Sequence, residues 1–412
     1  MKSPKWLPVM LGVLSAVGPV STDMYLPAFP AIEAALGGQP GTAQITLATW
    51  FMGLALGQIT QGSLSDRFGR RGPLIVGTVV YTCASVGCAM APNLLVLSIM
   101  RFIAAFGGSA SMVIPRAVVR DLTEGFASAK LMSQLMLVMG AVPILAPTLG
   151  GLVLGVSTWR TIFWAGAVYG ALCCFMVWRF LPDTLSPERR TSLRPTRLLA
   201  RYAGIVVERG FLSHALIGGF SMFGMFAYLG GSPDVFITLF HLSPPLYGTL
   251  FGCNAVGYIA ASQISPRLLP RFGADRIIRF AVRVFLCATL ALAVVAVAHP
   301  HPWWLVVAPI SVAFASMGFV MPNAVVGALA RHAHQAGAAS ALMGTLQFCL
   351  GAASGIAVGL LSNGSVAPMA MLMLIGAIGA NIADTTRPRP TAPQPAGTQR
   401  EEDVKASRTR LA

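Results

Sequence analysis

The feature that most constrains this chain is a series of twelve apolar runs, each long enough to cross a lipid bilayer. About 20 apolar residues in a helix span the roughly 30 Å of hydrocarbon, and a helix satisfies its own backbone hydrogen bonds where water is absent. The runs lie near residues 7–31, 43–63, 74–91, 95–117, 133–156, 162–181, 213–233, 243–264, 277–298, 303–325, 338–361 and 366–384. The pattern predicts an all-α polytopic membrane protein with twelve transmembrane helices.

The composition favours the same class. The chain of 412 residues is 55% hydrophobic and 10% charged, whereas a soluble domain carries about 25% charged residues. A net charge of +15 would suggest nucleic acid in a soluble protein, but basic residues also gather in the loops of membrane proteins. We therefore expect a bilayer around the chain and no nucleic-acid partner. The seven cysteines lie in apolar runs without metal-ligand spacing, so we expect them to be small core residues.

The basic residues predict the topology. With the N-terminus inside, all but two of the 29 Lys and Arg residues fall on the cytoplasmic side. The exceptions are Arg160, on the other side, and Arg101, within a span. This asymmetry predicts an even number of spans with both termini in the cytoplasm. We expect the protein in the cell inner (cytoplasmic) membrane.

A weak internal repeat divides the spans six and six. It pairs Tyr25 with Tyr228, Pro30 with Pro233, and Arg67-Phe68-Gly69 with Arg271-Phe272-Gly273. Paired halves are common in transporters. The division falls in a Pro- and Arg-containing stretch that we expect to be a cytoplasmic linker. The predicted parts are an N-terminal six-helix bundle (1–181), the linker (182–210), a C-terminal six-helix bundle (211–385) and a disordered cytoplasmic tail (386–412).

A charged loop joins the second and third runs. The stretch Gly62-Ser-Leu-Ser-Asp66-Arg67-Phe-Gly69-Arg70-Arg71-Gly resembles the loop between helices 2 and 3 of the major facilitator superfamily. The resemblance implies a fold of two pseudo-symmetric six-helix bundles. It also implies a cytoplasmic gating motif at Gly62, Asp66, Arg67, Gly69, Arg70 and Arg71. The plainer alternative is a basic turn that obeys the positive-inside rule.

Two charges lie inside predicted spans, where charge is costly and by default functional. Asp23 is in the first span and Arg101 in the fourth. Their positions along the helices place both roughly 10–12 Å below the outer face, at 1.5 Å per residue. We expect them to face a shared cavity, with Asp23 as proton carrier and Arg101 as its electrostatic partner. The alternative is an ion pair that only fixes helix packing.

Glycine and proline mark the fifth span. Gly140, Pro143, Pro147, Gly150 and Gly151 resemble the antiporter motif of exporters in the superfamily, although Ala146 replaces the usual Gly before Pro147. The alternative is ordinary small-residue packing. Similar flat faces are expected in three further spans, so that the two bundles can rock against each other. They are formed by Gly53 and Gly57, by Gly248 and Gly252, and by Gly351, Gly355 and Gly359.

Several segments together resemble the Bcr/CflA (bicyclomycin/chloramphenicol-resistance) drug:proton antiporters. They are Ser21-Thr-Asp-Met-Tyr-Leu-Pro27, Arg101-Phe-Ile103, Arg116-Ala-Val-Val-Arg-Asp-Leu122 and the stretch 339–348. Ala104 departs from the family, which usually has Gln beside the Arg. The resemblance implies a central substrate cavity, with Tyr25, Met222, Phe226, Tyr228, Asn254 and Gln347 as candidate lining residues. Ordinary helix packing is the alternative for each. We expect Asp234 to be a solvated outer-loop acid rather than a substrate contact.

The favoured function is proton-coupled export of small amphipathic drugs or toxic metabolites by alternating access. The alternative is a major-facilitator importer, a proton symporter of a small nutrient. A non-transporting sensor would need a blocked cavity. HExxH, G-x-S-x-G and Walker motifs are absent from the sequence, so we expect neither an enzyme nor an ATP-driven pump. We expect a monomer whose partners are a small-molecule substrate and protons, with no cofactor and no metal. The loop histidines are expected to be solvated: His299, His301, His332 and His334.

Overall fold

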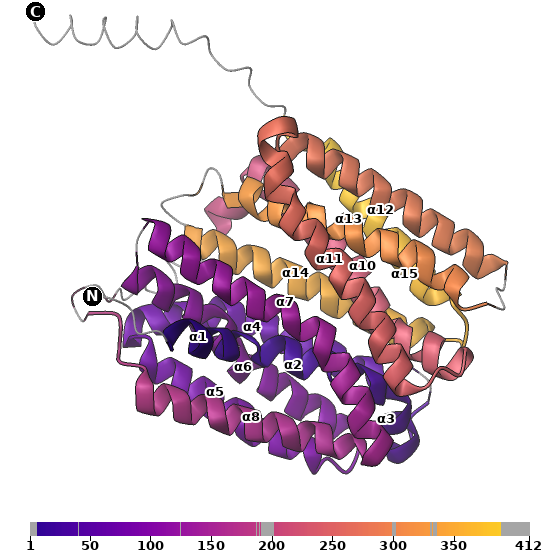
Figure 1. The fold of residues 1–412 in the computed structure, drawn as a ribbon, viewed down its shortest axis with the longest axis horizontal. Coiled ribbons are helices and arrows are strands. Elements are labelled where there is room, and N and C mark those ends of the chain that lie inside the picture. The colour runs from indigo at the N-terminus through magenta and orange to yellow at the C-terminus, as the bar shows by residue number, and fades with distance from the viewer. Residues whose placement is uncertain are drawn as a thin grey trace, which may run out of the picture.

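The structure is a computed structural model whose described residues are 6–39, 41–123, 125–186, 188, 190, 202–298, 302–329, 332 and 336–388. Every regular element in these ranges is helical, and the helices form twelve membrane-length segments (Figure 1). The predicted all-α fold of two six-helix bundles is confirmed. Figure 1 places the first half, indigo to magenta, beside the second half, pink to yellow.

The first segment is a chain of short helices. It consists of α1 (Leu7–Ser15), α2 (Val17–Asp23), the 3-10 turn η1 (Leu26–Ala28) and α3 (Phe29–Leu36). Proline stands in η1 and in the first turn of α3. A proline has no N–H and its ring displaces the preceding turn, so it is tolerated at a helix start and interrupts a helix elsewhere. The segment therefore breaks next to Asp23.

The other segments are mostly single long helices. The first half continues with α4 (Ala43–Phe68), α5 (Arg71–Ala89), α6 (Leu94–Leu122), α7 (Gly125–Val156) and α8 (Trp159–Phe180). The second half contains α10 (Arg209–Pro233), which continues into the π-helical turn η3 (Asp234–Leu239), then α11 (Pro244–Phe272), α12 (Ala274–Val297), α13 (Trp304–Leu329), α14 (Ala336–Leu361) and α15 (Ala367–Thr385).

Two of these helices are too polar to qualify as spans by hydropathy alone. Within the described residues nine segments are long and apolar enough to cross a membrane. The other three are α7, which counts only as a shorter apolar helix over Ala141–Val156, and the more polar α4 and α11. Their polar side chains are buried in the protein, as Gln44 and Gln58 are in α4 and Asn254 is in α11. A polar residue that faces other helices does not meet lipid, so both helices can still span.

The halves meet along two helix pairs. In the first pair α4 packs against α14, and in the second α7 packs against α11. Glycines allow the close approach: a methyl group at Gly248 would come within 2.6 Å of the Pro147 carbonyl oxygen, and one at Gly359 within 2.6 Å of the Gly41 carbonyl oxygen. Three of the four expected flat faces therefore contribute to the boundary, at Gly248 and Gly252, at Gly355 and Gly359, and on α7.

The expectation for Gly53 and Gly57 is wrong. A methyl group at Gly53 would meet the Phe102 carbonyl oxygen at 2.4 Å, and one at Gly57 would meet the Ser109 hydroxyl. Both neighbours lie on α6, in the same half. Glycines at this spacing indicate that another helix packs closely, but they do not identify which helix it is.

The cysteine expectation holds only in part. Cys88 and Cys173 are buried, whereas Cys83, Cys253, Cys287 and Cys349 are exposed on the helix bundle. In a membrane protein such a surface faces lipid, where a weakly polar thiol behaves as a small apolar group.

Candidate functional site

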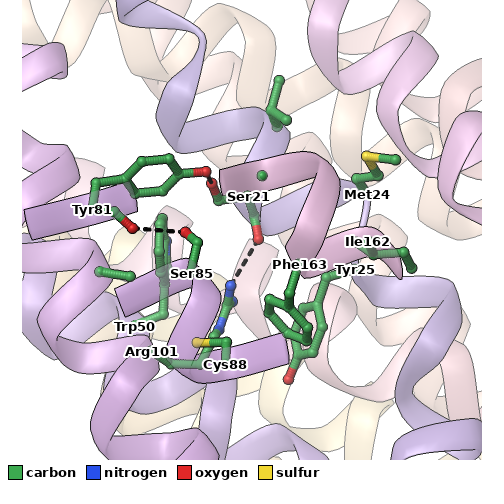
Figure 2. Close-up of a pocket in the computed structure, with 13 residues that line it drawn as sticks. Ser21, Met24, Tyr25, Trp50, Tyr81, Ser85, Cys88, Arg101, Ile162 and Phe163 are labelled. Carbon is green, nitrogen blue, oxygen red and sulfur yellow. Dashed lines mark hydrogen bonds between the residues drawn. The ribbon is translucent and has the colours of Figure 1, made fainter. Parts of the chain in front are cut away.

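A buried arginine lies at the centre of the first half. Arg101 in α6 is 1% exposed, and its guanidinium lies 4.2 Å from the ring centroid of Tyr25 and 4.4 Å from that of Trp50. Aromatic faces attract a cation that has lost its water. Nη1 donates to the carbonyl oxygen of Ser21 at 2.9 Å (Figure 2). Because α2 ends at Asp23, this carbonyl is in the last turn of a helix and is available to a side chain.

A small pocket lies beside the guanidinium. Its cavity volume is about 20 Å³, which is room for about one water molecule, and its lining combines aromatic rings with hydroxyl groups and a thiol. Its lining includes Ser21, Tyr25, Trp50, Tyr81, Ser85, Cys88, Arg101 and Phe163. The Nε and Nη2 atoms of Arg101 are buried and have no hydrogen-bond partner in the part of the chain that is described. The pocket therefore presents two free donors of a cation to a polar ligand or water.

Asp23 is buried at 7% exposure but does not line this pocket. The pocket is bordered by Ser21 and Met24, on either side of the acid. No hydrogen bond or ion pair links the Asp23 carboxylate to another described residue. The next residue, Met24, lies against α7 of the boundary, because a methyl group at Gly150 would come within 1.9 Å of the Met24 carbonyl oxygen. The structure thus places Asp23 near the boundary between the halves and does not form the expected ion pair with Arg101.

Arg70 is the centre of the predicted gating motif. Its Nη1 contacts Asp66 at 2.5 Å, and its Nε donates to Asp121 of α6 at 2.7 Å. Its backbone N–H donates to Asp183, which follows α8, at 2.8 Å. Arg70 is 5% exposed, and the two carboxylates raise the pKa of its guanidinium against the opposing effect of burial, which is the largest single influence. One arginine, at the start of α5, thus contacts α4, α6 and the segment after α8. We call this end of the first half the Arg70 end.

The other residues of the predicted gating motif make separate contacts. Gly69 has φ +90°, and a methyl group there would lie 1.9 Å from the Asp183 carboxylate, so no other residue fits. Arg71 donates to the carbonyl oxygen of Trp178 at 2.6 Å. Arg67 is exposed and lies over the Phe68 ring, and a methyl group at Gly62 would make only an ordinary contact with Val113, at 3.8 Å. Among these motif residues, only Arg70 connects several helices.

The antiporter-motif residues fix α7 between the halves. A methyl group at Gly150 would lie 1.9 Å from the Met24 carbonyl oxygen, directly after Asp23. One at Gly151 would lie 2.6 Å from the carbonyl oxygen of Pro244, where α11 begins. Pro147 provides the carbonyl that Gly248 approaches. Pro143 and Gly140 lie about one and two helical turns before Pro147 in α7. The motif thus connects the Asp23 segment to α11.

The predicted cavity residues do not gather around the Arg101 pocket, except for Tyr25. Phe226 of α10 stacks on Phe51 of α4 at 3.8 Å, with Phe348 of α14 beside both, so this stack of three rings bridges the halves. The Tyr228 hydroxyl accepts a hydrogen bond from Asn254 within the second half.

Two predicted cavity residues remain. Gln347 is half-buried, and its Nε2 has no partner in the described chain. Met222 packs at the edge of the main apolar core.

Asp234 is not a solvated loop acid. It is half-buried, and its Oδ2 accepts hydrogen bonds from Gln44 of α4 at 2.8 Å and from Ser362, after α14, at 3.2 Å. Glu33 was not singled out from the sequence. Its Oε1 accepts from the backbone N–H groups of Gly41 and Ala43, so it caps the start of α4. Both acids lie opposite the Arg70 end, at what we call the Asp234 end.

Two loop and tail expectations need correction. His332 lies 3.3 Å from Glu208 and its side chain is 15% exposed, so it is not free in solvent. Arg387 pairs with Asp275 at 2.7 Å and also with Asp384, so the predicted disordered tail begins with an anchored residue. Residues 389–412 lie outside the described ranges, and so do the other three loop histidines, His299, His301 and His334.

The geometry describes a two-halved helical membrane protein with buried charge. The family model of the Major Facilitator Superfamily matches residues 11–356 of this chain. The chain belongs to this superfamily. It is thus a multi-pass membrane protein of transporter type.

Relatives cover most of the chain. An uncharacterized MFS-type transporter, YdgK, of Bacillus subtilis is 33% identical over 92% of this chain and 94% of its own. A bicyclomycin resistance protein homolog of Haemophilus influenzae is 30% identical over 88% and 91%. A chloramphenicol resistance protein of Pseudomonas aeruginosa is 28% identical over 83% and 80%. These relatives agree with the Bcr/CflA resemblance of the motifs.

Solved structures share the superfamily fold at low identity. A bacterial homolog of the human lysosomal transporter Spinster superposes with a TM-score of 0.72 at 15% identity, over 92% of this chain and 95% of that one. A D-xylose-proton symporter gives 0.71 at 16% identity, over 92% and 96%. At such identity the likeness shows the fold.

Proposed function

We propose that this carrier exports small amphipathic drugs or toxic metabolites in exchange for protons, by alternating access. It would act as a monomer in the inner membrane with both termini in the cytoplasm. Residues 1–181 and 211–385 would form the two moving bundles, joined by 182–210. The proposal draws on the antiporter-motif contacts of α7 and on relatives named for bicyclomycin, chloramphenicol and multidrug resistance.

The observation that carries the proposal is Asp23. It is a buried carboxylate at a helix break, close to the boundary between the halves, with no cation bound to it among the described residues. A charged carboxylate without a partner is costly away from water, so its protonation state has to change with the surroundings that each conformation gives it. Rocking of α11 past η1, which follows Asp23, would change those surroundings. Asp23 would therefore take a proton from one side and release it to the other.

Arg101 acts in this scheme as a fixed charge. Its guanidinium keeps its proton in proteins, so it cannot be the carrier. It donates a hydrogen bond to the carbonyl oxygen of Ser21, two residues before Asp23. A shift of the α2 end would therefore alter both the Arg101 hydrogen bond and the position of the acid. This gives a mechanical link in place of the direct ion pair.

The substrate region we propose is the stack of Phe51, Phe226 and Phe348. Flat rings offer apolar area to an amphipathic molecule with little loss of conformational freedom. Gln347, whose Nε2 lacks a partner in the described chain, is in the same helix as Phe348 and can add a hydrogen bond. Met222, Tyr228 and Asn254 would support this region from α10 and α11.

Everted membrane vesicles test the direction. With an acidified interior, vesicles that contain the protein should accumulate chloramphenicol or bicyclomycin above vesicles that lack it, and an uncoupler should abolish the difference. Cells of a pump-deleted host should also become less susceptible to the same drugs. A proton symporter that imports nutrients would show no drug accumulation and no change in susceptibility, which would contradict the proposal.

A further inference from the structure

A groove lies between α5 and α8, on the outer side of the first half. The two helices pack against each other, and Figure 1 places them at the edge of the molecule away from the second half. The groove has a volume of about 370 Å³ and is separate from the Arg101 pocket. It is lined from α5 by Val79, Thr82 and Cys83, and from α8 by residues that include Ala171, Phe175 and Trp178.

A close helix contact beside the groove explains why the space stays open. At Gly170 α8 approaches α5, since a methyl group there would lie 2.5 Å from the Thr82 hydroxyl oxygen. Next in the chain to this contact, Ala171 and on the facing helix Cys83 have small side chains that leave space between the helices. The Thr82 hydroxyl donates to the carbonyl oxygen of Thr78 at 2.8 Å. The groove therefore offers apolar contact to a ligand.

The dimensions of the groove fit part of one lipid chain. From Ala171 to Trp178 it extends about 10 Å along α8, at 1.5 Å per residue, within the roughly 15 Å of hydrocarbon in one leaflet. Phe175 and Trp178 are 53% and 60% exposed, so both rings face lipid. Because Trp gathers at the membrane–water interface, we infer that the Trp178 end of the groove lies at the level of the lipid headgroups.

This Trp178 end is positively charged. Arg71, at the start of α5, donates from Nη2 to the carbonyl oxygen of Trp178 at 2.6 Å. Its Nε is buried and has no hydrogen-bond partner in the described part of the chain. Arg179 follows Trp178 and is exposed. Among the described residues neither arginine pairs with a carboxylate, so both are available to a phosphate, which suits the fork of N–H donors of a guanidinium.

We propose that the α5–α8 groove binds one anionic phospholipid from the leaflet at the Arg70 end, with an acyl chain along the groove and the phosphate at Arg71 and Arg179. A zwitterionic lipid carries its own cation beside the phosphate, whereas an anionic lipid leaves that charge to the protein. The bound lipid would contact both helices and thereby stabilise the Arg70 end. The proposal goes beyond export and is independent of which substrate is carried.

Native mass spectrometry of the purified, delipidated full-length protein tests the site. It would be titrated with phosphatidylglycerol or with phosphatidylcholine of the same acyl chains. We expect tighter binding of phosphatidylglycerol, by roughly fivefold for each basic residue at the headgroup. Arg71→Gln should lose most of this preference. Ala171→Trp, which fills the groove, should weaken the binding of both lipids.

Matched controls separate the groove from the general lipid surface. Arg276→Gln removes an exposed arginine at the start of α12, in the other half, and Leu172→Trp enlarges an exposed residue of α8 that does not line the groove. Both variants should bind the two lipids as the wild type does. Losses in these controls equal to those in Arg71→Gln and Ala171→Trp would contradict a specific site.

A photoreactive lipid locates the site in the unaltered protein. Phosphatidylglycerol with a photoreactive group in one acyl chain should crosslink mainly to residues 79–83 of α5 and 171–178 of α8. Two results would overturn the proposal: crosslinks spread evenly over the lipid-facing helices, or equal affinity of the wild type for both lipids. Neither result bears on the proposed export, which the everted vesicles test separately.

Discussion

Arg101 is a full positive charge that meets no carboxylate among the described residues. Its compensation comes from three aromatic rings, of which those of Tyr25 and Trp50 are nearest, and from one backbone carbonyl. These contacts require a flat guanidinium, because an ammonium group cannot stack on Tyr25 and Trp50 while it donates sideways to Ser21. The shape of this side chain therefore matters in addition to its charge.

We expect Arg101→Lys to fold but to transport poorly. Loss of one buried charge-assisted hydrogen bond costs about 1.5–3 kcal/mol, which corresponds to roughly a 10- to 100-fold reduction in drug uptake by everted vesicles. Arg160→Lys is the matched control, because Arg160 also donates to a backbone carbonyl and stacks on a ring, Trp159, but lies outside the pocket. Equal losses in both variants would mean that Arg101 has no special role.

Single residues also show what the sequence could and could not reveal. The sequence placed Asp66 and Arg70 four residues apart in one charged loop, but it did not pair them; the structure does. Asp121 and Asp183 were not assigned to Arg70, since they are distant in the chain and only the packing of α6 and the segment after α8 brings them together. Asp234 was misjudged for the same reason: its partners lie on α4 and after α14.

At the scale of elements, α7 and α11 form a close backbone contact between the halves. Their backbones approach where Gly248 meets Pro147 and where Gly151 meets Pro244. Such close approach maximises dispersion contacts between helices in lipid, where the hydrophobic effect contributes nothing. It also gives a smooth surface along which two bundles can move.

We expect Gly248→Ala to impair the carrier. The added methyl would overlap the Pro147 carbonyl and the Thr148 backbone at 2.6–2.7 Å, and overpacking of this kind costs about 1–3 kcal/mol. Thermal unfolding of the purified protein should shift to lower temperature, and drug uptake should fall. Gly257→Ala on the same helix has no neighbour within 4 Å, so it should keep both properties; an equal loss there would show that helix flexibility, not contact, is what matters.

The pattern of elements was largely predictable, but their interruptions were not. Runs of about 20 apolar residues set the twelve segments because lipid allows few alternatives. The break of the first segment into α1, α2, η1 and α3 depends on how prolines, Arg101 and the Met24–Gly150 contact combine. Polar faces of α4 and α11 likewise depend on which neighbour covers them.

At the scale of the whole molecule, three of the charged sites lie at different depths along the helices. The Arg70 cluster ties the first half together at one end, Asp23 lies near the boundary, and Asp234 joins the halves at the other end. A carrier that alternates has to break contacts at one end while it forms them at the other. On this account, protonation of Asp23 biases which end is closed.

The most direct test of the central claim separates transport driven by protons from drug movement alone. Purified wild-type protein and Asp23→Asn would be reconstituted in liposomes loaded with chloramphenicol. With a pH gradient, the wild type should concentrate the drug, whereas Asp23→Asn should not; without a gradient, both should exchange labelled for unlabelled drug. Gradient-driven accumulation by Asp23→Asn at the wild-type rate would contradict the account.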